Sequence, residues 1–161
     1  EEEEQFDLLK MLGNINDYLG GDAKSKGVEF ISDLPADPIP FHGLEARLAQ
    51  VFVNLITNAI SFCDDGDAIR VWARKRENRV LIVIEDTGPG IPDEAFHKIF
   101  QRFYSERPAG QFGNNSGLGL AISKQIVEAH GGVIWAENIR PTDADITSEP
   151  LGARFVVGLP V

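Results

Sequence analysis

The sequence predicts an α/β fold, a two-layer sandwich in which helices cover one face of a mixed β-sheet. Two stretches, near residues 43–63 and 118–130, repeat apolar residues at spacings of three and four, as amphipathic helices do. The β-rich stretches come as one pair at 68–84 and a late pair at 133–159, with helices between them. This order favours a mixed sheet over a fully parallel one.

The N-terminal part of the chain predicts one helix and one strand. Residues 5–19 place their apolar side chains on one helical stripe, and Gly20 and Gly21 are expected to end that helix. The four glutamates before it are expected to be exposed to solvent. Residues 28–34 predict a short strand, and the prolines within residues 35–40 argue against regular pairing there because proline lacks a backbone N–H.

The middle of the chain predicts a long helix and a hairpin. The helix at 43–63 turns one apolar face inward, and the aspartates at 64–67 end it. Residues 68–74 and 79–84 are β-rich and joined by a short connection, which predicts a hairpin. The inward residues of the helix are expected to be Leu44, Leu48, Val51, Phe52, Leu55, Ala59 and Ile60.

The C-terminal half predicts a mobile loop, a second helix and two strands. Pro92 is placed for the first turn of a short helix that reaches about residue 100. Residues 105–116 have Gly, Pro and Asn without apolar periodicity and predict a mobile loop. The helix at 118–130 precedes strands at 133–136 and 154–159, which flank a loop at 138–150. Its inward residues are expected to be Leu120, Ile122, Ile126, Val127 and Ala129.

Composition excludes several functions. The formal net charge is −10, and it is still −6 without the four glutamates at positions 1–4, which argues against a nucleic-acid partner and a polybasic membrane contact. The sequence contains no run of about 18 apolar residues, which a membrane-spanning helix would need. The lone cysteine, Cys63, excludes a disulfide within the chain and a multi-cysteine metal site, and an inert packing role is the simplest interpretation.

Asparagines recur on one face of the long predicted helix. Gln50, Asn54, Asn58 and Phe62 follow one another every four residues and therefore share that face. An amide oxygen is a neutral ligand that suits Mg²⁺, which takes much of its shell from water and nucleotide phosphates. Taken alone, two asparagines on the wet side of a helix are the more common arrangement.

A second polar segment, residues 85–92, follows the apolar strand directly. Asp86 at the end of a strand is placed to accept the exocyclic amino proton of adenine, whereas guanine presents a carbonyl there. Gly88 and Gly90, which precede Ile91, lack a Cβ and permit close approach of a flat ligand. An ordinary aspartate-containing turn is the alternative.

A third segment, residues 116–120, ends the glycine-rich loop and opens the second helix. Unpaired backbone N–H groups at a helix start favour an anion. The segment is not a P-loop, because no Gly-Lys-Ser/Thr follows, and it lacks the third glycine of the dinucleotide fingerprint, where Ile122 stands. A plain glycine-rich helix start is the simpler interpretation of this segment alone.

In chain order, these segments resemble the N, G1, F and G2 boxes of the ATP-binding domain of sensor histidine kinases. Residues 100–103 correspond to the F box, and residues 50–59 and 117–122 match that family nearly letter for letter. The resemblance covers about residues 43–160. It implies the ATP-binding fold shared with gyrase, Hsp90 and MutL, with a loop that acts as a lid. The box sequences look closest to the ChvG/ExoS type of bacterial sensor kinase.

The resemblance implies a role for each matching residue. It implies Asn58 as the Mg²⁺ ligand, Asn54 as a catalytic residue near the phosphates and Asp86 as the partner of the adenine amino group. Phe100 and Phe103 are implied to anchor the lid, although they are equally suited to plain core packing. The other residues implied to contact the nucleotide are Phe62, Gly88, Gly90, Ile91, Ser116, Gly117, Leu118 and Gly119.

Some positions depart from the family pattern. Ser61 and Phe62 stand where many relatives have Lys and Tyr, so a cation near the phosphates is missing while an aromatic wall for adenine is retained. Arg102, assigned a catalytic role, and Arg107, assigned to the cofactor, are candidates to replace that cation, although a solvated surface charge is the simpler interpretation of each. Asn115 replaces the first glycine of the G2 box and also tolerates a positive φ.

The implied reaction is phosphoryl transfer from Mg·ATP. The ATPases of this superfamily activate water with a glutamate at the place of Asn54, and an amide cannot take a proton, which disfavours rapid hydrolysis and favours a kinase. The family's acceptor is a histidine on a separate helical hairpin, and none of the three histidines here fits its pattern. A gyrase-type ATPase, a serine-phosphorylating anti-sigma kinase and a non-catalytic nucleotide-binding scaffold remain alternatives.

The resemblance also divides the chain and implies partners. Residues 22–161 are predicted to form the catalytic domain. Residues 1–21 are predicted to be the tail of the phosphoacceptor domain or a linker, or else an integral part of the catalytic domain. The implied partners are ATP or ADP, the acceptor domain and a response regulator. The parent is expected to be a homodimer in the bacterial inner membrane, and this segment a cytoplasmic monomer that does not label itself.

Overall fold

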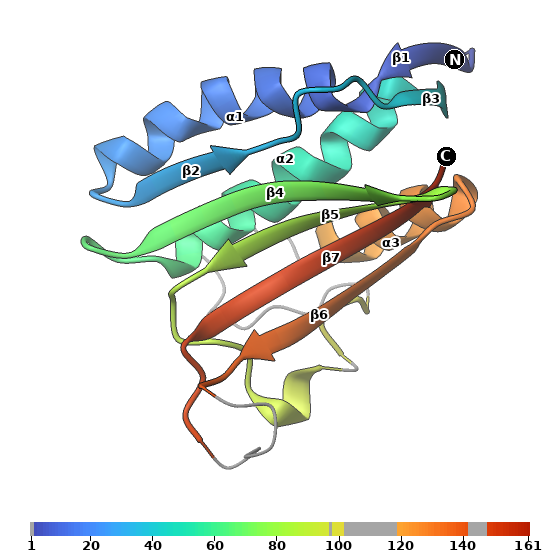
Figure 1. Ribbon diagram of the computed structural model, residues 1–161. Coiled ribbons are helices and arrows are strands. Elements are labelled where there is room, and N and C mark those ends of the chain that lie inside the picture. Colours follow the sequence, from blue (N-terminus) through green and yellow to red (C-terminus); the bar gives the residue numbers. More distant parts are fainter. Residues whose placement is uncertain (1, 97, 102–118, 142–147) are drawn as a thin grey trace.

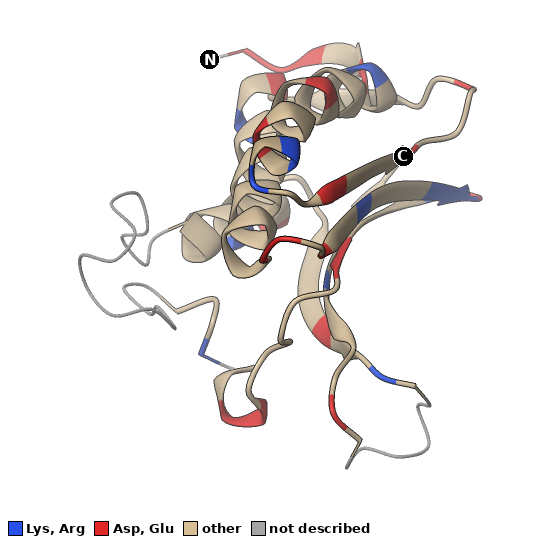
Figure 2. Cartoon of the chain, turned by 90° about the vertical axis from the view of Figure 1, so that its left-hand side faces the viewer, with Lys and Arg blue, Asp and Glu red and all other residues tan. Residues whose placement is uncertain are grey.

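The computed structural model describes residues 2–96, 98–101, 119–141 and 148–161. In these residues a five-stranded sheet packs its inner face against three α-helices (Figure 1), and the outer face carries no helix (Figure 2). The strand order is β2-β4-β5-β7-β6, with β2 parallel to β4 and the other neighbours antiparallel. The predicted two-layer α/β sandwich with a mixed sheet is confirmed.

The elements follow the predicted order. The strands are β1 (Glu4–Asp7), β2 (Glu29–Asp33), β3 (Pro40–Gly43), β4 (Ala68–Arg76), β5 (Arg79–Asp86), β6 (Val133–Ile139) and β7 (Gly152–Pro160). The helices are α1 (Leu8–Ser25), α2 (Glu45–Phe62) and α3 (Gly119–Ala129), with a short 3₁₀ helix at Asp93–Ala95. The β4–β5 hairpin is confirmed. Of the predicted helix from Pro92 to about residue 100, the described residues show that 3₁₀ turn, followed by a further turn in which the Ile99 N–H donates to the Ala95 carbonyl at 3.0 Å.

The prediction that Gly20 and Gly21 end the first helix is wrong, because α1 continues to Ser25. Two glycines cost a helix about 2 kcal/mol relative to alanine, but Ala23 beyond them is fully buried and keeps the last turn in contact with the core. Gly27, with φ +83°, ends the helix instead. Its N–H and that of Val28 bond back to carbonyls of the last turn, at Lys24 and Ala23.

The N-terminal residues form a small second sheet. β1 pairs with β3, so Pro40 does take part in a strand pair, contrary to the expectation for the proline-rich segment. Proline is tolerated there because it stands at the first position of the strand. Asp7 joins the pieces, since its Oδ1 accepts the N–H groups of Leu9 and Ile39 at 3.0 and 2.9 Å. The side chains of residues 2–5 are exposed, as predicted.

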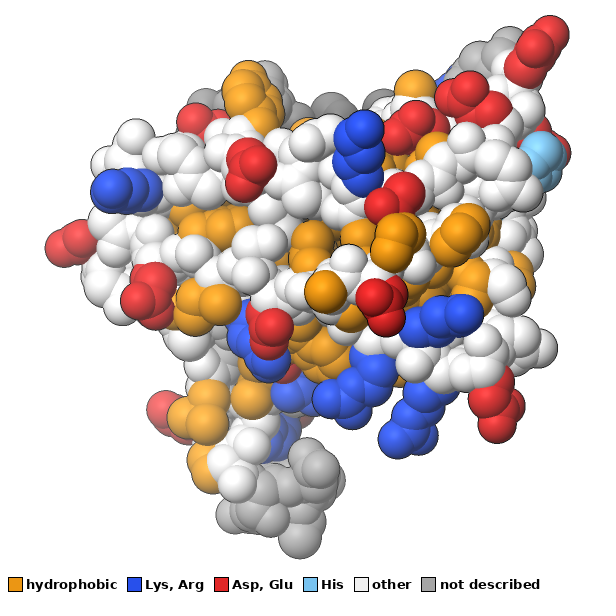
Figure 3. Space-filling view, turned by 45° about the horizontal axis from the view of Figure 1, so that its top comes forward, with side chains coloured by type: hydrophobic (Ala, Val, Ile, Leu, Met, Phe, Trp, Pro, Cys, Tyr) orange, Lys and Arg blue, Asp and Glu red, His pale blue; other side chains and the backbone are white. Residues whose placement is uncertain are grey.

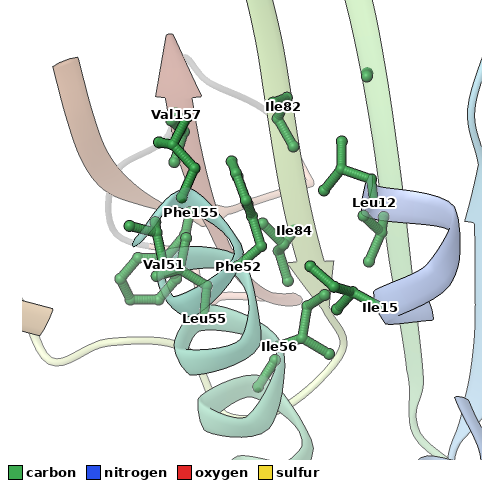
Figure 4. Close-up of a cluster of buried hydrophobic side chains, with 14 of the residues drawn as sticks. Leu12, Ile15, Val51, Phe52, Leu55, Ile56, Ile82, Ile84, Phe155 and Val157 are labelled. Atoms are coloured by element: carbon green, nitrogen blue, oxygen red, sulfur yellow. The ribbon is translucent and has the colours of Figure 1, made fainter. Parts of the chain in front are cut away.

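The core lies between α2 and the inner face of the sheet, with Leu12 and Ile15 of α1 beside it (Figure 4). Helices α1 and α3 both pack against α2. Phe52 and Leu55 of α2 are fully buried, and each such side chain stabilises the fold by about 1.5 to 3 kcal/mol. The division of the chain at residue 21 remains a prediction, and α1 crosses that residue without a break.

The C-terminal elements differ from prediction in two details. Ala129, expected to face inward on α3, is exposed, and Ser123 is buried instead, because the buried stripe of α3 runs through Ala121, Ser123, Ile126 and Val127. Strand β6 continues three residues beyond its predicted end at 136, since it pairs with β7 as far as Ile139. The predicted mobile loop at 105–116 lies outside the described residues.

The helices α2 and α3 are tied together at one end by His130. Its Nε2 accepts the N–H of Leu44, just before α2, at 3.1 Å, and its Nδ1 bonds the carbonyl of Ile126 in α3 at 2.8 Å. These two bonds fix the relative position of the two helices. None of the helices in the described residues is long and apolar enough to cross a membrane.

Candidate functional site

The candidate site lies where β5 ends, beside the C-terminal turn of α2 and the start of α3. Asp86 is the last residue of β5 and points to the helix side of the sheet, as Ile84 and Ile82 do. Its side chain is only 6% exposed. A carboxylate held this deep is unusual unless it has partners, so Asp86 is the first candidate for a functional role.

Burial raises the pKa of Asp86 to about 6, and the nearby charge of Asp67 adds to the shift. The backbone N–H groups of Gly88 and Ala153 oppose it by stabilising the ionised form. The Gly88 N–H donates to Oδ1 at 2.9 Å. The carboxylate is therefore ionised at neutral pH and keeps acceptor capacity for a ligand.

Stability is expected to depend on the titration of Asp86. The pKa of this group in the folded chain is about 6 against an ordinary value of 3.8, so the folded state binds the proton more tightly. The associated stabilisation is present below about pH 4 and is lost as pH rises through 6, a loss of about 3 kcal/mol. Urea unfolding of wild type and Asp86→Asn between pH 4 and 7 measures it. The free-energy difference between the two should change with pH in that direction, and a constant difference contradicts the assignment.

The turn after Asp86 is held in one shape by close contacts. A side chain at Gly88 would be crowded, because an added Cβ would lie 3.0 Å from Asp86 Oδ1 and 3.2 Å from the Phe62 carbonyl oxygen. Gly90 has a φ of +84°, and an added Cβ there would lie 2.9 Å from Asn138 Oδ1. Gly90 is thus required by the turn that follows the buried carboxylate, and Gly88 is favoured there.

Asn138, at the end of β6, clamps this turn. Its Oδ1 accepts the Ile91 N–H at 2.7 Å and its Nδ2 donates to the Ile91 carbonyl at 2.8 Å. Local sequence patterns do not indicate this role, because the two residues are 47 positions apart and Asn138 falls where a loop was predicted. The role of Thr87 was not predicted either, because its partners also lie far from it along the chain. Its hydroxyl donates to Asp67 and accepts the Ala68 N–H, both at 2.9 Å.

Replacing Asn138 by alanine is expected to destabilise the fold by about 1 to 3 kcal/mol, because both backbone groups of Ile91 lose their partners. Affinity for ADP should fall about tenfold as the turn loosens. Asn14→Ala, on the exposed side of α1, is the matched control and should change neither quantity. Thermal unfolding and calorimetric titration with ADP test both effects. An unaltered ADP affinity in Asn138→Ala would show that the clamp does not shape the site.

The asparagine face of α2 points toward the start of α3. Asn54 and Asn58 are both half-buried, and a Cβ added to Gly119 would lie 3.8 Å from Asn54 Nδ2. The structure thus brings Gly119, the first residue of α3, next to Asn54, and Phe62 next to Gly88. Within the described residues, the amide groups of Asn54 and Asn58 form no hydrogen bond, which leaves them available for a ligand.

The end of α2 has a cation that the sequence did not predict. Lys26 Nζ lies 2.9 Å from the carbonyl oxygen of Ile60 and 3.4 Å from that of Ser61. A positive charge at the C-terminus of a helix is favourable. The Ser61 hydroxyl, which replaces the family's lysine, donates to the Asn58 carbonyl at 2.6 Å.

Phe100 and Cys63, two residues singled out in the sequence, pack in or against the core. Phe100 is described, and its ring packs edge-on against Phe155 of β7 with centroids 6.2 Å apart, as a core residue does. Cys63 is fully buried and its pKa is raised to about 12, mainly by burial, so its inert role is confirmed. The candidate residues that lie outside the described residues are Arg102, Phe103, Arg107, Asn115, Ser116, Gly117 and Leu118.

A metal ion bound at this site would have few protein ligands. Among the described residues, no three or more His, Cys, Asp or Glu side chains are grouped to hold a metal ion. An ion with one amide ligand, water and phosphate oxygens needs no such group, and that is how Mg²⁺ commonly binds with nucleotides. The half-buried amide of Asn58 fits this kind of site.

Comparison with known proteins agrees with this geometry. Residues 43–161 match the family of histidine kinase-, DNA gyrase B- and HSP90-like ATPases. The chain belongs to this ATPase family. Sensor protein ChvG of Rhizobium meliloti (strain 1021) is 43% identical over 164 residues, which cover 97% of this chain and 28% of that protein. The chain therefore spans little more than a quarter of this relative.

Solved structures place the chain within the family. The nucleotide-free catalytic domain of histidine kinase ThkA superposes with a TM-score of 0.83 and 25% identity, covering 99% of this chain and 96% of that one. ShkA, solved at full length in complex with AMPPNP, gives a TM-score of 0.78 and 26% identity over 98% of this chain and 31% of that one. The prediction of an ATP-binding catalytic domain of the sensor histidine kinase type is confirmed.

Proposed function

We propose that this domain transfers the γ-phosphate of Mg·ATP to a histidine on a separate helical domain, for relay to a response regulator. The observation that carries the proposal is the buried carboxylate of Asp86 at the end of β5, with the amides of Asn54 and Asn58 on the neighbouring helix. The relative with AMPPNP bound supports nucleotide binding by this fold.

Adenine recognition is assigned to Asp86. An ionised carboxylate accepts the exocyclic amino group of adenine and repels the carbonyl that guanine has at that position. Gly88 lets the backbone pass close to the carboxylate, and Phe62 supplies an aromatic surface at the end of α2. Gly90 and Ile91, held by Asn138, fix the backbone around the base.

The phosphates are assigned to the space between α2 and α3. Asn58 would hold Mg²⁺, which neutralises phosphate charge during the transfer. Asn54 and Gly119 lie next to each other here, and the start of α3 favours anions through its unpaired N–H groups. We assign three residues just before α3 to the phosphates as well: Ser116, Gly117 and Leu118. Arg102 and Arg107 are proposed to supply positive charge near the phosphates. An amide at position 54 does not act as a base toward water, so transfer is favoured over hydrolysis.

The remaining assignments concern the parent protein. Residues 1–21 are proposed to connect this domain to the phosphoacceptor domain, with β1 as the first element of the connection. The leucines of α1 pack on the catalytic domain. The parent is proposed to be a homodimeric sensor kinase of the inner membrane. This segment is proposed to be monomeric and cytoplasmic.

A transfer assay in trans tests the proposal. The chain is incubated with γ-labelled ATP and Mg²⁺, alone and with the separately purified phosphoacceptor domain of the parent. Label should appear on the acceptor domain only, and it should be lost in acid and stable in alkali, as phosphohistidine is. Rapid phosphate release by the chain alone would indicate an ATPase instead. Acid-stable label on a serine of the acceptor would indicate a serine kinase, and binding without transfer a scaffold.

A further inference from the structure

In the described residues no helix covers the outer face of the sheet (Figure 1), and the strand register arranges its side chains in rows across the strands. We call it the open face. The register aligns Trp72, Val83, Val156 and Trp135 in one row across β4, β5, β7 and β6. The next row toward the β4–β5 turn is Arg74, Leu81, Gly158 and Val133. Both tryptophans of the chain therefore lie on the open face.

The centre of the open face is apolar. Val83 and Val156 are 2% and 3% exposed although they point away from the helices, because the larger side chains around them cover them. Trp135 and Val133 beside them are 39% and 44% exposed. The solvent-facing side of a sheet normally carries polar residues. A continuous apolar band there is typical of an interaction surface.

On one side of this band, the charged side chains form ion pairs with one another. Alternating acids and bases form a ladder across all five strands, and Trp72 and Trp135 donate from their indole nitrogens to two of its glutamates at 2.9 and 3.0 Å. Its members are Asp33, Arg70, Glu85, Arg154 and Glu137. Each arginine on this side of the open face is paired with two acids, so this side offers no unpaired positive charge to a partner.

On the other side of the band lie arginines that form no ion pair with an acidic side chain in the described residues. Within the described residues, Arg74, Arg76 and Arg79 form no ion pair, although the chain as a whole carries a net charge of −10. Arg76 lies directly opposite Arg79 in the β4–β5 pair, and like charges opposite one another destabilise a sheet. The Arg74 guanidinium lies over the Trp72 ring, 5.6 Å from its centroid. Figure 3 shows Lys and Arg side chains gathered beside hydrophobic ones.

We propose that the open face docks an amphipathic helix whose apolar side packs on the Trp72–Trp135 row and whose acidic flank faces Arg74, Arg76 and Arg79. The row spans three strand spacings, about 14 Å. A helix of about ten residues covers that length. Tryptophan and arginine are the residues that most often dominate binding energy at interfaces. The surface is separate from the proposed ATP site, which lies on the helix side of the sheet.

Intrinsic tryptophan fluorescence tests this docking, because both reporters lie on the open face. The probe is an 18-residue synthetic helix without tryptophan, with a leucine stripe and glutamates along one flank; its scrambled sequence is the first control. The intended peptide should shift the fluorescence saturably, and the scrambled peptide should bind at least tenfold more weakly. Equal binding of both would overturn the proposal by showing only charge attraction.

Charge reversal locates the binding. Arg74→Glu with Arg76→Glu should weaken the peptide at least tenfold, whereas the matched pair Lys10→Glu with Lys24→Glu on exposed positions of α1 should not. Unchanged ADP affinity shows that each variant is folded. The proposal is overturned if the two pairs behave alike, if no peptide binds, or if only vesicles of phosphatidylglycerol shift the fluorescence.

Discussion

Replacing Asp86 by asparagine is expected to weaken ADP binding about 100-fold and, at the same time, to stabilise the unliganded domain at neutral pH. The loss follows from removing a charged acceptor of the adenine amino group, which contributes about 1.5 to 3 kcal/mol. The gain follows because burial raises the pKa of this carboxyl to about 6, so that its ionisation at pH 7 destabilises the fold. The residue thus contributes to binding at the expense of stability.

Isothermal titration with ADP and urea unfolding at pH 7 measure the two effects. Glu94→Gln, on the nearby exposed 3₁₀ helix, is the control and should change neither. The opposite signs make the prediction specific, since a variant that merely damages the fold loses both stability and affinity. Retained ADP affinity in Asp86→Asn would remove the assigned base contact.

Replacing Asn58 by alanine is expected to reduce phosphoryl transfer about 100-fold while leaving metal-free ADP binding unchanged. The amide is assigned to Mg²⁺, whose charge stabilises the phosphates during transfer, and losing such a contact typically costs that factor. The backbone should tolerate the change, because alanine favours the helix and the Asn58 side chain forms no hydrogen bond within the described residues.

The measurement compares ADP affinity with and without Mg²⁺, together with transfer in trans. Thr57→Ala, at an exposed neighbouring position of α2, is the matched control and should retain both. If Asn58→Ala weakens ADP equally with and without Mg²⁺, the residue acts on the nucleotide or on the fold rather than through the metal.

Local patterns predicted the elements that carry the candidate site. The four-residue spacing of Asn54 and Asn58 placed both on one face of α2, and the apolar run before Asp86 placed that carboxylate at a strand end. Both features depend only on helix and strand periodicity. The family resemblance then assigned roles that neither periodicity nor composition supplies.

Long-range contacts were not predictable from local patterns. The Asn138 clamp on Ile91 joins residues 47 positions apart, and the true end of α1 is set by Gly27 and the burial of Ala23 rather than by the two earlier glycines. The rows of the open face were also hidden, because they depend on the register of four strands. Such features appear only when the sheet is assembled.

The most direct test of the proposed function is a crystal structure of this chain with Mg·AMPPNP. The proposal predicts the adenine amino group within hydrogen-bond distance of the Asp86 carboxylate and the metal ion bound to the phosphates and to the Asn58 amide oxygen. A nucleotide bound on another surface, or a base turned away from Asp86 in a fully occupied site, would contradict it.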